Sequence, residues 1–313
     1  MTVGLRDIVD AASLIRDRVR ITPVMEVDPK DFGLNWGGKL SLKLEGLQHT
    51  GSFKPRGVFT TLLSEGPSNA PVTAFSGGNH GAAVAYAAEA LGRKATIFVP
   101  EYAPKKKVDK IRGYGADLRI VGETIFQTID AYNEYRAETG ATAIHAYGAP
   151  MTIAGQGTVG LEWAEQCPGL DSVLVAVGGG GLISGVATAM QTGPDVIGVE
   201  PVGACCAKKA REAGGPVDMP PKSIAADSLG APSIEPLNHE LIEDYVSSLV
   251  TVEDDAIREA QLMLWRQCGL AVEAGAATAL AALTSGVVRP EAGAHIGALV
   301  CGTNVDLATL EAA

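Results

Sequence analysis

The sequence lacks any run of apolar residues long enough to cross a membrane. A spanning helix needs at least about 18 consecutive apolar residues, and no stretch of the chain reaches that length. The N-terminus also shows no basic segment followed by an apolar core, so no secretory signal is visible. We therefore expect no membrane partner and a cytoplasmic location.

The chain also lacks a cysteine framework and an excess of positive charge. The five cysteines are an odd number without a CxxC spacing, which is typical of a reduced protein without disulfides. The net charge is -11, which argues against nucleic acid as a partner. An anionic small ligand stays compatible with this charge, because backbone amides can supply local positive potential.

What the chain does contain is a large apolar fraction and many glycines. Apolar residues make up 46% of the 313 residues, enough for two modest domains or one large one. Many of the 38 glycines lie between expected strands and helices, where backbone must approach a ligand closely.

Hydrophobic periodicity predicts alternating strands and helices along the chain. The expected strands are 40–44, 72–75, 95–100, 118–121, 143–145, 172–177, 196–199 and 297–300. The expected helices are 4–19, one beginning at 58–63, 82–91, 104–114, 125–139, 153–165 and 182–190. Repeated strand–loop–helix units predict an α/β fold with parallel sheets and right-handed crossovers.

One lysine stands in an unusual setting, the segment Thr50-Gly51-Ser52-Phe53-Lys54-Pro55-Arg56-Gly57. A desolvated lysine amine is nucleophilic and can form a Schiff base with a carbonyl cofactor. Three glycine-rich segments accompany it further along: Ser76-Gly77-Gly78-Asn79-His80-Gly81, Gly178-Gly179-Gly180-Gly181 and Cys301-Gly302-Thr303-Asn304.

The four consecutive glycines at 178–181 follow an apolar strand and precede a helix. Such a turn directs backbone N–H groups and a helix N-terminus at one point, which suits a phosphate. A dinucleotide fold is the rival interpretation, because Glu200 ends the next strand where a ribose-binding acid would lie. However, Ile183 and Ser184 break every GxGxxG register, and no GK[ST] follows. We therefore favour a phosphate that is not part of a dinucleotide.

The segment from Lys43 to Lys54 resembles the cofactor-lysine segment of the threonine/serine dehydratases. These are pyridoxal-phosphate (PLP) enzymes of fold type II, the tryptophan-synthase β-like superfamily. The three glycine-rich segments stand in the family's order, and Ile224-Ala225-Ala226-Asp227 and Val272-Glu273-Ala274-Gly275 fit it too. The resemblance covers nearly the whole chain.

The resemblance implies a two-domain fold of type II, with parallel twisted sheets flanked by helices. It places a large PLP-binding domain at 1–70 and 149–313, and a small inserted α/β domain at 71–148. The cofactor, pyridoxal 5'-phosphate, would lie in the cleft between them. Proteins of this type are usually homodimers or larger homo-oligomers.

The resemblance also implies roles for single residues. Lys54 would bind the cofactor aldehyde and then remove the substrate α-proton. The other cofactor contacts would be Phe53 beside the ring, Asn79 at the phenolic oxygen, Cys301 at the pyridine nitrogen, and Gly178, Gly179, Gly180, Gly181 and Leu182 at the phosphate. The substrate carboxylate would be held by Ser76, Gly77, Asn79 and His80.

Three of these assignments keep an alternative. His80 is equally well explained as a residue at a helix N-terminus without a ligand. Cys301 could be a small buried apolar cysteine; as a neutral thiol at the ring it would favour elimination over transamination. Glu273 lies near the cofactor by its family position but could equally be a structural acid.

The sequence departs from the family at two places. Serine racemases carry a second serine where this chain has Gly77, and glycine has no proton to give to the opposite face of the substrate. Many relatives bind a divalent cation through a Glu, a carbonyl and an Asp. Glu200 and Ala204 match the first two, but Cys206 replaces the Asp, and a thiol is a poor ligand for a hard cation. We expect no strong metal site, and a weak cation at Glu200 stays an alternative.

These observations predict an enzyme, a PLP-dependent L-threonine/L-serine ammonia-lyase. It would eliminate water from a small amino-acid substrate to give a 2-oxo acid and ammonia. The alternatives are a dehydratase of another 3-hydroxy amino acid such as 3-hydroxyaspartate or phenylserine, a serine racemase, and a non-catalytic PLP-binding protein.

Overall fold

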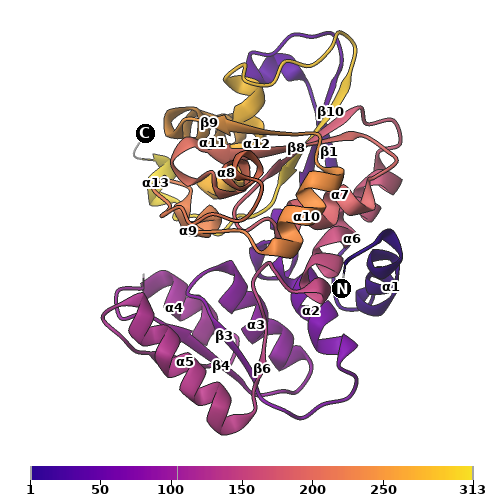
Figure 1. Cartoon of the computed structure of the whole chain (residues 1–313). Helices are drawn as coiled ribbons and strands as arrows, with labels where there is room; N and C mark the ends of the chain where they lie inside the picture. The colour runs from indigo at the N-terminus through magenta and orange to yellow at the C-terminus, as the bar shows by residue number, and fades with distance from the viewer. Residues whose placement is uncertain (1, 104, 312–313) are drawn as a thin grey trace.

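The chain folds into two sheets with helices packed around them (Figure 1). The computed structural model describes residues 2–103 and 105–311. The larger sheet has six strands and draws on both ends of the chain, whereas the smaller has four strands from one continuous segment. Both come from the same sequence pattern, in which a short apolar strand is followed by a helix.

The six-stranded sheet is parallel except at one edge. Its strands, in spatial order, are β1 (Val24–Val27), β2 (Lys39–Leu44), β10 (His295–Val300), β7 (Ser172–Ala176), β8 (Asp195–Pro201) and β9 (Ser248–Val252). Only β1 is antiparallel to its neighbour, β2. The central strand β7 is apolar along its length because both of its faces are buried.

The four-stranded sheet is entirely parallel. Its order is β5 (Asp117–Ile120), β4 (Ala95–Val99), β3 (Val72–Phe75) and β6 (Thr142–Ala143). The helices beside it are α3 (Asn79–Ala90), α4 (Lys105–Arg112) and α5 (Ile125–Thr139). Its apolar core also takes Ile15, Val58, Phe59 and Leu62 from outside this segment.

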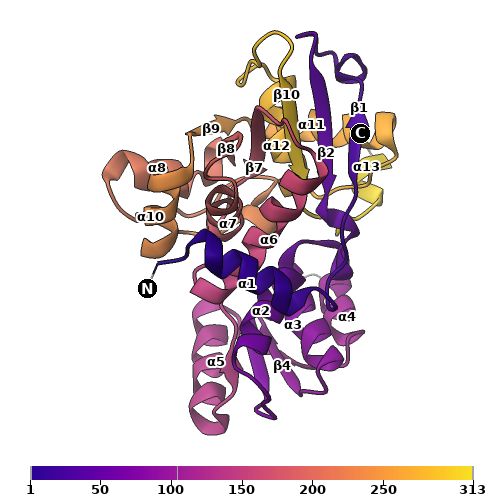
Figure 2. The same ribbon diagram turned by 90° about the vertical axis from the view of Figure 1, so that its right-hand side faces the viewer.

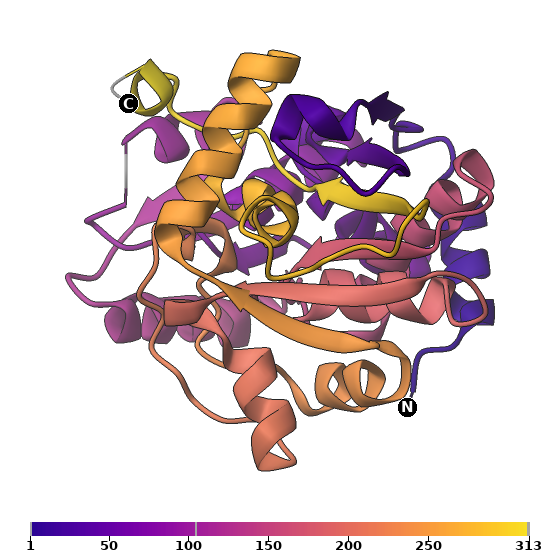
Figure 3. The same ribbon diagram turned by 90° about the horizontal axis from the view of Figure 1, so that it is seen from above.

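The remaining helices belong mainly to the larger sheet and to the region between the two sheets (Figures 2 and 3). They are α1 (Leu5–Ile15), α2 (Lys54–Ser64), α6 (Pro150–Gln166), α7 (Gly181–Ala189), α8 (Cys206–Ala213), α9 (Ala226–Leu229), α10 (Pro236–Tyr245), α11 (Asp254–Cys268), α12 (Ala274–Thr284) and α13 (Ala308–Glu311). Helix α12 packs on β7, β8, β9 and β10, and α11 covers α12. Short 3-10 turns η1 (Pro29–Phe32), η2 (Glu45–Leu47), η3 (His49–Gly51) and η4 (Val202–Ala204) complete the fold.

The predicted α/β fold with parallel sheets is confirmed, with shifts at the ends of elements. The helix expected at 4–19 ends at Ile15, and the strand expected at 143–145 is the two-residue β6. Lys54 does not lie in a loop before the helix expected near residue 58, but is the first residue of α2, with Pro55 in the first turn. Of the helix expected at 104–114, Lys105–Arg112 is observed, and residue 104 lies outside the described residues.

In the part of the chain that the structure describes, no helix is both long and apolar enough to cross a membrane. The inserted domain at 71–148 stays a prediction; all strands of the smaller sheet fall within it, although its core extends to α1 and α2.

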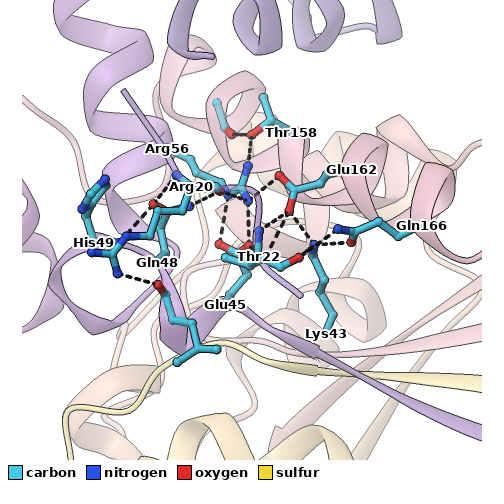
Figure 4. A network of polar contacts seen from close by, with 12 residues as sticks. Arg20, Thr22, Lys43, Glu45, Gln48, His49, Arg56, Thr158, Glu162 and Gln166 are labelled. Carbon is cyan, nitrogen blue, oxygen red and sulfur yellow. Dashed lines mark hydrogen bonds and ion pairs between the residues drawn. The ribbon is translucent and has the colours of Figure 1, made fainter. Parts of the chain in front are cut away.

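A buried network of charged side chains joins β2, α2 and α6 close to Lys54 (Figure 4). Arg56 donates to both carboxylate oxygens of Glu45, at 2.9 and 2.7 Å, and to Glu162 at 2.8 Å. Lys43 donates to the other oxygen of Glu162 at 2.6 Å and to the backbone oxygen of Thr22 at 2.8 Å. The network therefore pairs two buried cations with two carboxylates.

The pKa values in this network reflect its charge pairing. Burial alone lowers the pKa of Arg56, but the carboxylates of Glu45 and Glu162 raise it above its ordinary value. Burial raises the pKa of Glu162, and the stronger combined effect of Arg56 and Lys43 lowers it. Removing one ion would leave the others buried without full compensation.

We predict that Arg56→Met lowers the free energy of unfolding by about 3–5 kcal/mol, the usual cost of breaking a buried ion pair from one side. Arg6→Met is the matched control, because the Arg6 side chain is 94% exposed. The control should change stability by less than about 0.5 kcal/mol. Denaturant unfolding of both variants measures the difference. A loss below about 1 kcal/mol for Arg56→Met would contradict a stabilising role for the network.

Candidate active site

Lys54 is the first residue of α2. Its Nζ donates to the backbone oxygen of Ala146 at 2.8 Å and lies 5.0 Å from the centre of the Phe53 ring. Loss of water around the amine lowers the pKa of Lys54 to about 8, although Cys301 and Glu273 act in the opposite direction. At pH 7 about a tenth of the amine is therefore neutral and nucleophilic, far more than in a lysine with an ordinary pKa.

Cys301 lies beside the Lys54 segment, at the end of β10. The backbone N–H of Phe53 donates to the Cys301 oxygen at 3.3 Å, and Ser52 forms a β-bridge with Gly302. Burial, reinforced by the charge of Glu273, raises the pKa of the Cys301 thiol to about 12. The thiol therefore stays neutral, as the sequence analysis requires of a weak partner for a ring nitrogen.

The glycine turn after β7 forms the second wall of the site. Among the described residues, no group accepts a hydrogen bond from the backbone N–H of residues 178–183, which include Leu182. The positive end of α7 adds to their potential. Gly180 has a φ of +87°, and a Cβ on Gly181 would lie 2.5 Å from the backbone oxygen of Tyr147. The turn thus needs glycine and leaves its N–H groups available to a phosphate.

The loop from Ser76 leads into α3 on the facing side. Its Ser76 Oγ accepts from the Gly78 N–H at 3.2 Å, while no described group accepts from the N–H of Gly77, Asn79 or His80. These N–H groups are suited to a carboxylate.

The His80 side chain, unlike the N–H groups of that loop, is already bound within the protein. Its Nε2 donates to the Ile144 oxygen at 2.9 Å, and burial lowers the pKa of His80 to about 3. The imidazole is therefore neutral, with an unprotonated Nδ1 that cannot donate to a carboxylate. Any contact of His80 with substrate would come from its backbone.

Asn79 is bound within the protein at both ends of its amide. Its Nδ2 donates to the two carboxylate oxygens of Glu273, at 3.0 and 2.9 Å. Its Oδ1 accepts from Asn304 Nδ2 at 2.6 Å, and Asn304 in turn accepts from Lys110. The sequence analysis gave no role to Lys110 or Asn304, and it left Glu273 undecided.

A cavity of about 860 Å³ opens beside Asn79 and Glu273. Its apolar wall includes Ala82, Ile224, Ala274 and Val305, and the polar side chains that line it are Asn79, Lys110, Asp227, Ser228, Arg258, Gln261, Glu273, Thr303, Asn304, Asp306 and Thr309. The Oγ of Ser228 is buried and has no hydrogen-bond partner among the described residues. The cavity reaches Gly77 and Gly78, so it adjoins the loop expected to hold a carboxylate.

The residues considered for a cation are arranged as a helix cap. Both oxygens of the buried Glu200 carboxylate accept backbone N–H groups at the start of α8, from Ala207 at 2.9 Å and Lys208 at 2.8 Å. The Cys206 thiol donates to the Gly178 oxygen at 3.4 Å. Within the described residues, no group of three or more His, Cys, Asp or Glu side chains could hold a metal ion.

A family model described as pyridoxal-phosphate dependent enzyme matches residues 15–302. The chain belongs to this family. The resemblance to the PLP enzymes of fold type II, and to the threonine/serine dehydratases among them, is thereby confirmed. Its cofactor is pyridoxal 5'-phosphate.

Relatives of this family extend along nearly the whole chain. Phenylserine dehydratase of Ralstonia pickettii is 41% identical over 318 residues, covering 98% of this chain and 96% of its own. L-threonine ammonia-lyase of Thermotoga maritima is 36% identical and covers 87% of this chain and 68% of its own. The structure of maize serine racemase aligns with a TM-score of 0.91 at 35% identity, covering 100% of this chain and 97% of its own. These comparisons support a PLP-dependent dehydratase and leave its substrate open.

The residues present fit pyridoxal phosphate. Lys54 Nζ donates to the Ala146 oxygen, the glycine turn approaches the next residue, Tyr147, and the Cys301 thiol is near enough to influence the charge of Lys54. We propose that Lys54 holds the aldehyde carbon, that Gly178–Leu182 hold the phosphate, and that Phe53, Asn79 and Cys301 contact the ring. We propose Ser76, Gly77, Asn79 and the His80 backbone for the substrate carboxylate.

The lowered pKa of Lys54 predicts how the cofactor enters the apoprotein. Only the neutral amine condenses with an aldehyde, so the rate should rise with pH, with a midpoint at about 8. Nα-acetyl-lysine in solution, which keeps its side-chain amine, is the control and should show its midpoint at about 10.4. Stopped-flow absorbance of the bound cofactor measures both curves. A midpoint near that of the free amine would contradict a desolvated Lys54.

The close approach of Gly181 to Tyr147 predicts a loss of cofactor affinity in Gly181→Ala. The added methyl would meet backbone, which must move the start of α7. Overpacking of this kind costs about 1–3 kcal/mol, so we expect the PLP dissociation constant to rise about 10-fold or more. Gly215→Ala is the control, because nothing lies within 4 Å of a Cβ there. Equal dissociation constants for the two variants would show that the turn does not contact the phosphate.

Proposed function

We propose that this protein is a PLP-dependent dehydratase acting on a 3-hydroxy amino acid with an uncharged side chain. The observation that supports it most directly is the desolvated Lys54 amine, whose charge is influenced by Glu273 on the wall of a cavity of about 860 Å³. When bound, pyridoxal phosphate supplies a conjugated ring that takes up the electron pair left on the substrate α-carbon. The products would be ammonia and a 2-oxo acid.

The residues of the chain account for the proton transfers and the orientation. A lysine with a pKa near 8 can remove the α-proton at neutral pH and release it again. The neutral Cys301 thiol does not place a proton on the ring nitrogen. By leaving the ring nitrogen without a proton, Cys301 would favour early departure of the β-hydroxyl, which suits elimination.

The charges around the cavity argue for a neutral substrate side chain. Lys110 and Arg258 are its basic side chains among the described residues, and both already donate to protein groups. Asp227, Glu273 and Asp306 line the same space. A second substrate carboxylate, as in 3-hydroxyaspartate, would find neither Lys110 nor Arg258 without a protein partner.

Within the neutral substrates we propose 3-phenylserine ahead of L-threonine and L-serine, which the sequence analysis favours. The cavity of about 860 Å³ has room for a phenyl group; pockets for drug-sized ligands span about 300–1,000 Å³. The relative from Ralstonia pickettii, a phenylserine dehydratase, matches this chain end to end. Phenylserine would give phenylpyruvate and ammonia.

A racemase is less well supported. A Cβ on Gly77 would make ordinary contacts, 3.6 Å from Val99 and 3.7 Å from Ala103, so the loop has space for a side chain but carries none. The face of the substrate opposite Lys54 therefore lacks the hydroxyl that the sequence analysis associates with racemases. We further propose that the protein forms a homodimer or larger homo-oligomer, which light scattering of the purified protein tests. We also propose a cytoplasmic location.

The test is 2-oxo acid release from 3-phenylserine, L-threonine, L-serine and 3-hydroxyaspartate. We expect the highest kcat/KM for 3-phenylserine and the lowest for 3-hydroxyaspartate. Lys54→Ala should lower kcat by at least about 100-fold, the usual contribution of a positioned base.

The panel separates the alternatives. A preference for 3-hydroxyaspartate would contradict the proposal of a substrate with an uncharged side chain. A preference for threonine would support the substrate that the sequence predicts. Inversion of L-serine without oxo acid would identify a racemase. Bound cofactor with no reaction in any assay would leave a binding protein.

A further inference from the structure

Four polar side chains form one continuous hydrogen-bonded series from Lys110 to Glu273. Lys110 Nζ donates to Asn304 Oδ1, and Asn304 Nδ2 donates to Asn79 Oδ1 at 2.6 Å. Asn79 Nδ2 donates to both oxygens of Glu273, at 3.0 and 2.9 Å. The series crosses between the sheets three times, because Lys110 and Asn79 lie beside the smaller sheet while Asn304 and Glu273 lie beside the larger.

The chemistry of its two ends gives this series a direction. A charged lysine amine can only donate, and a carboxylate can only accept. Asn304 must therefore turn its oxygen toward Lys110 and its Nδ2 toward Asn79. Asn79 is then obliged to accept with its oxygen and to keep Nδ2 as the donor. An amide alone could adopt either orientation, but the whole series allows one.

The same lysine also supports the backbone that leads to Lys54. Lys110 Nζ and Asn304 Nδ2 both donate to the Thr50 oxygen, each at 2.9 Å. Thr50 has a φ of +62°, which is costly for a β-branched residue. Two donors from separate parts of the fold thus stabilise a strained peptide four positions before the reactive lysine.

We infer that Lys110 and Asn304 are positioning residues. They keep the two Nδ2 hydrogens of Asn79 turned toward Glu273 and the cofactor ring, so that one can serve the carboxylate and the other the ring, and they fix the approach to Lys54. Neither touches the reacting atoms; both act through Asn79 and the Thr50 peptide. The inference rests on the proposed contact of Asn79 with pyridoxal phosphate, and it is independent of which amino acid is the substrate.

Two variants test the inference on the holoenzyme. Lys110→Met removes the donor and keeps most of the side-chain length. Asn304→Asp keeps the shape and the acceptor for Lys110 but removes the Nδ2 donor, so Asn79 would have to turn its amide. We expect both variants to shift the absorption band of the bound cofactor and to raise its dissociation constant about 10-fold or more, the effect of losing a hydrogen bond to a charged or buried group.

Lys94→Met is the matched control, since Lys94 is an exposed lysine of the same segment. It should leave the absorption band and the dissociation constant unchanged. Lower melting temperatures in Lys110→Met and Asn304→Asp with an unaltered band and unaltered affinity would assign the series a structural role only and overturn the inference. If Lys110→Met does not fold, Asn304→Asp alone decides. Both readouts need no substrate, so a failure of the proposed reaction would be seen separately.

Discussion

The position of Lys54 depends on four buried charges that must remain paired. Lys43, Glu45, Arg56 and Glu162 come from β2, the turn after it, α2 and α6, and their side chains are at most 15% exposed. Each buried ion costs several kcal/mol unless its partners lie at hydrogen-bond distance. Small displacements of α2 would break contacts of 2.6–2.9 Å, so the helix has little freedom. Lys54 stands two residues from Arg56 and therefore shares this constraint.

The sequence indicated the family and the cofactor because the residue types of its motifs are chemically restrictive. A turn of four glycines and a lysine beside a phenylalanine suit few kinds of site besides a cofactor pocket, and the roles of the single residues stay predictions. The charged network was not predicted. Lys43 alternates with leucines in β2, which suggests a solvated face, yet α6 covers that face and buries the side chain completely. Strands β1 and β9 were also missed, since they lie at the edges and are only partly buried.

Contacts between residues far apart in the chain explain why the sequence did not indicate the series from Lys110 to Glu273. Lys110 belongs to a lysine-rich helix that resembles a solvated surface, and 194 positions separate it from Asn304. Asn79 and Glu273 are equally far apart. Periodicity describes one element at a time, so it cannot show that two sheets bring such residues together. The place of Glu273 in the site becomes visible only in the folded protein, where its carboxylate accepts from the Asn79 amide.

The site also explains how an acidic protein can hold anionic ligands. At neutral pH the Cys301 thiol and the His80 imidazole are uncharged, and Lys54 is partly so. On the proposed assignments, backbone N–H groups at the starts of α7 and α3 supply positive potential for a phosphate and a substrate carboxylate beside the charge of Lys54. Such groups do not titrate, whereas Lys54 does. Anion binding at this site is therefore separated from proton transfer, and the pH dependence of the chemistry is left to a single amine whose pKa is set by its burial.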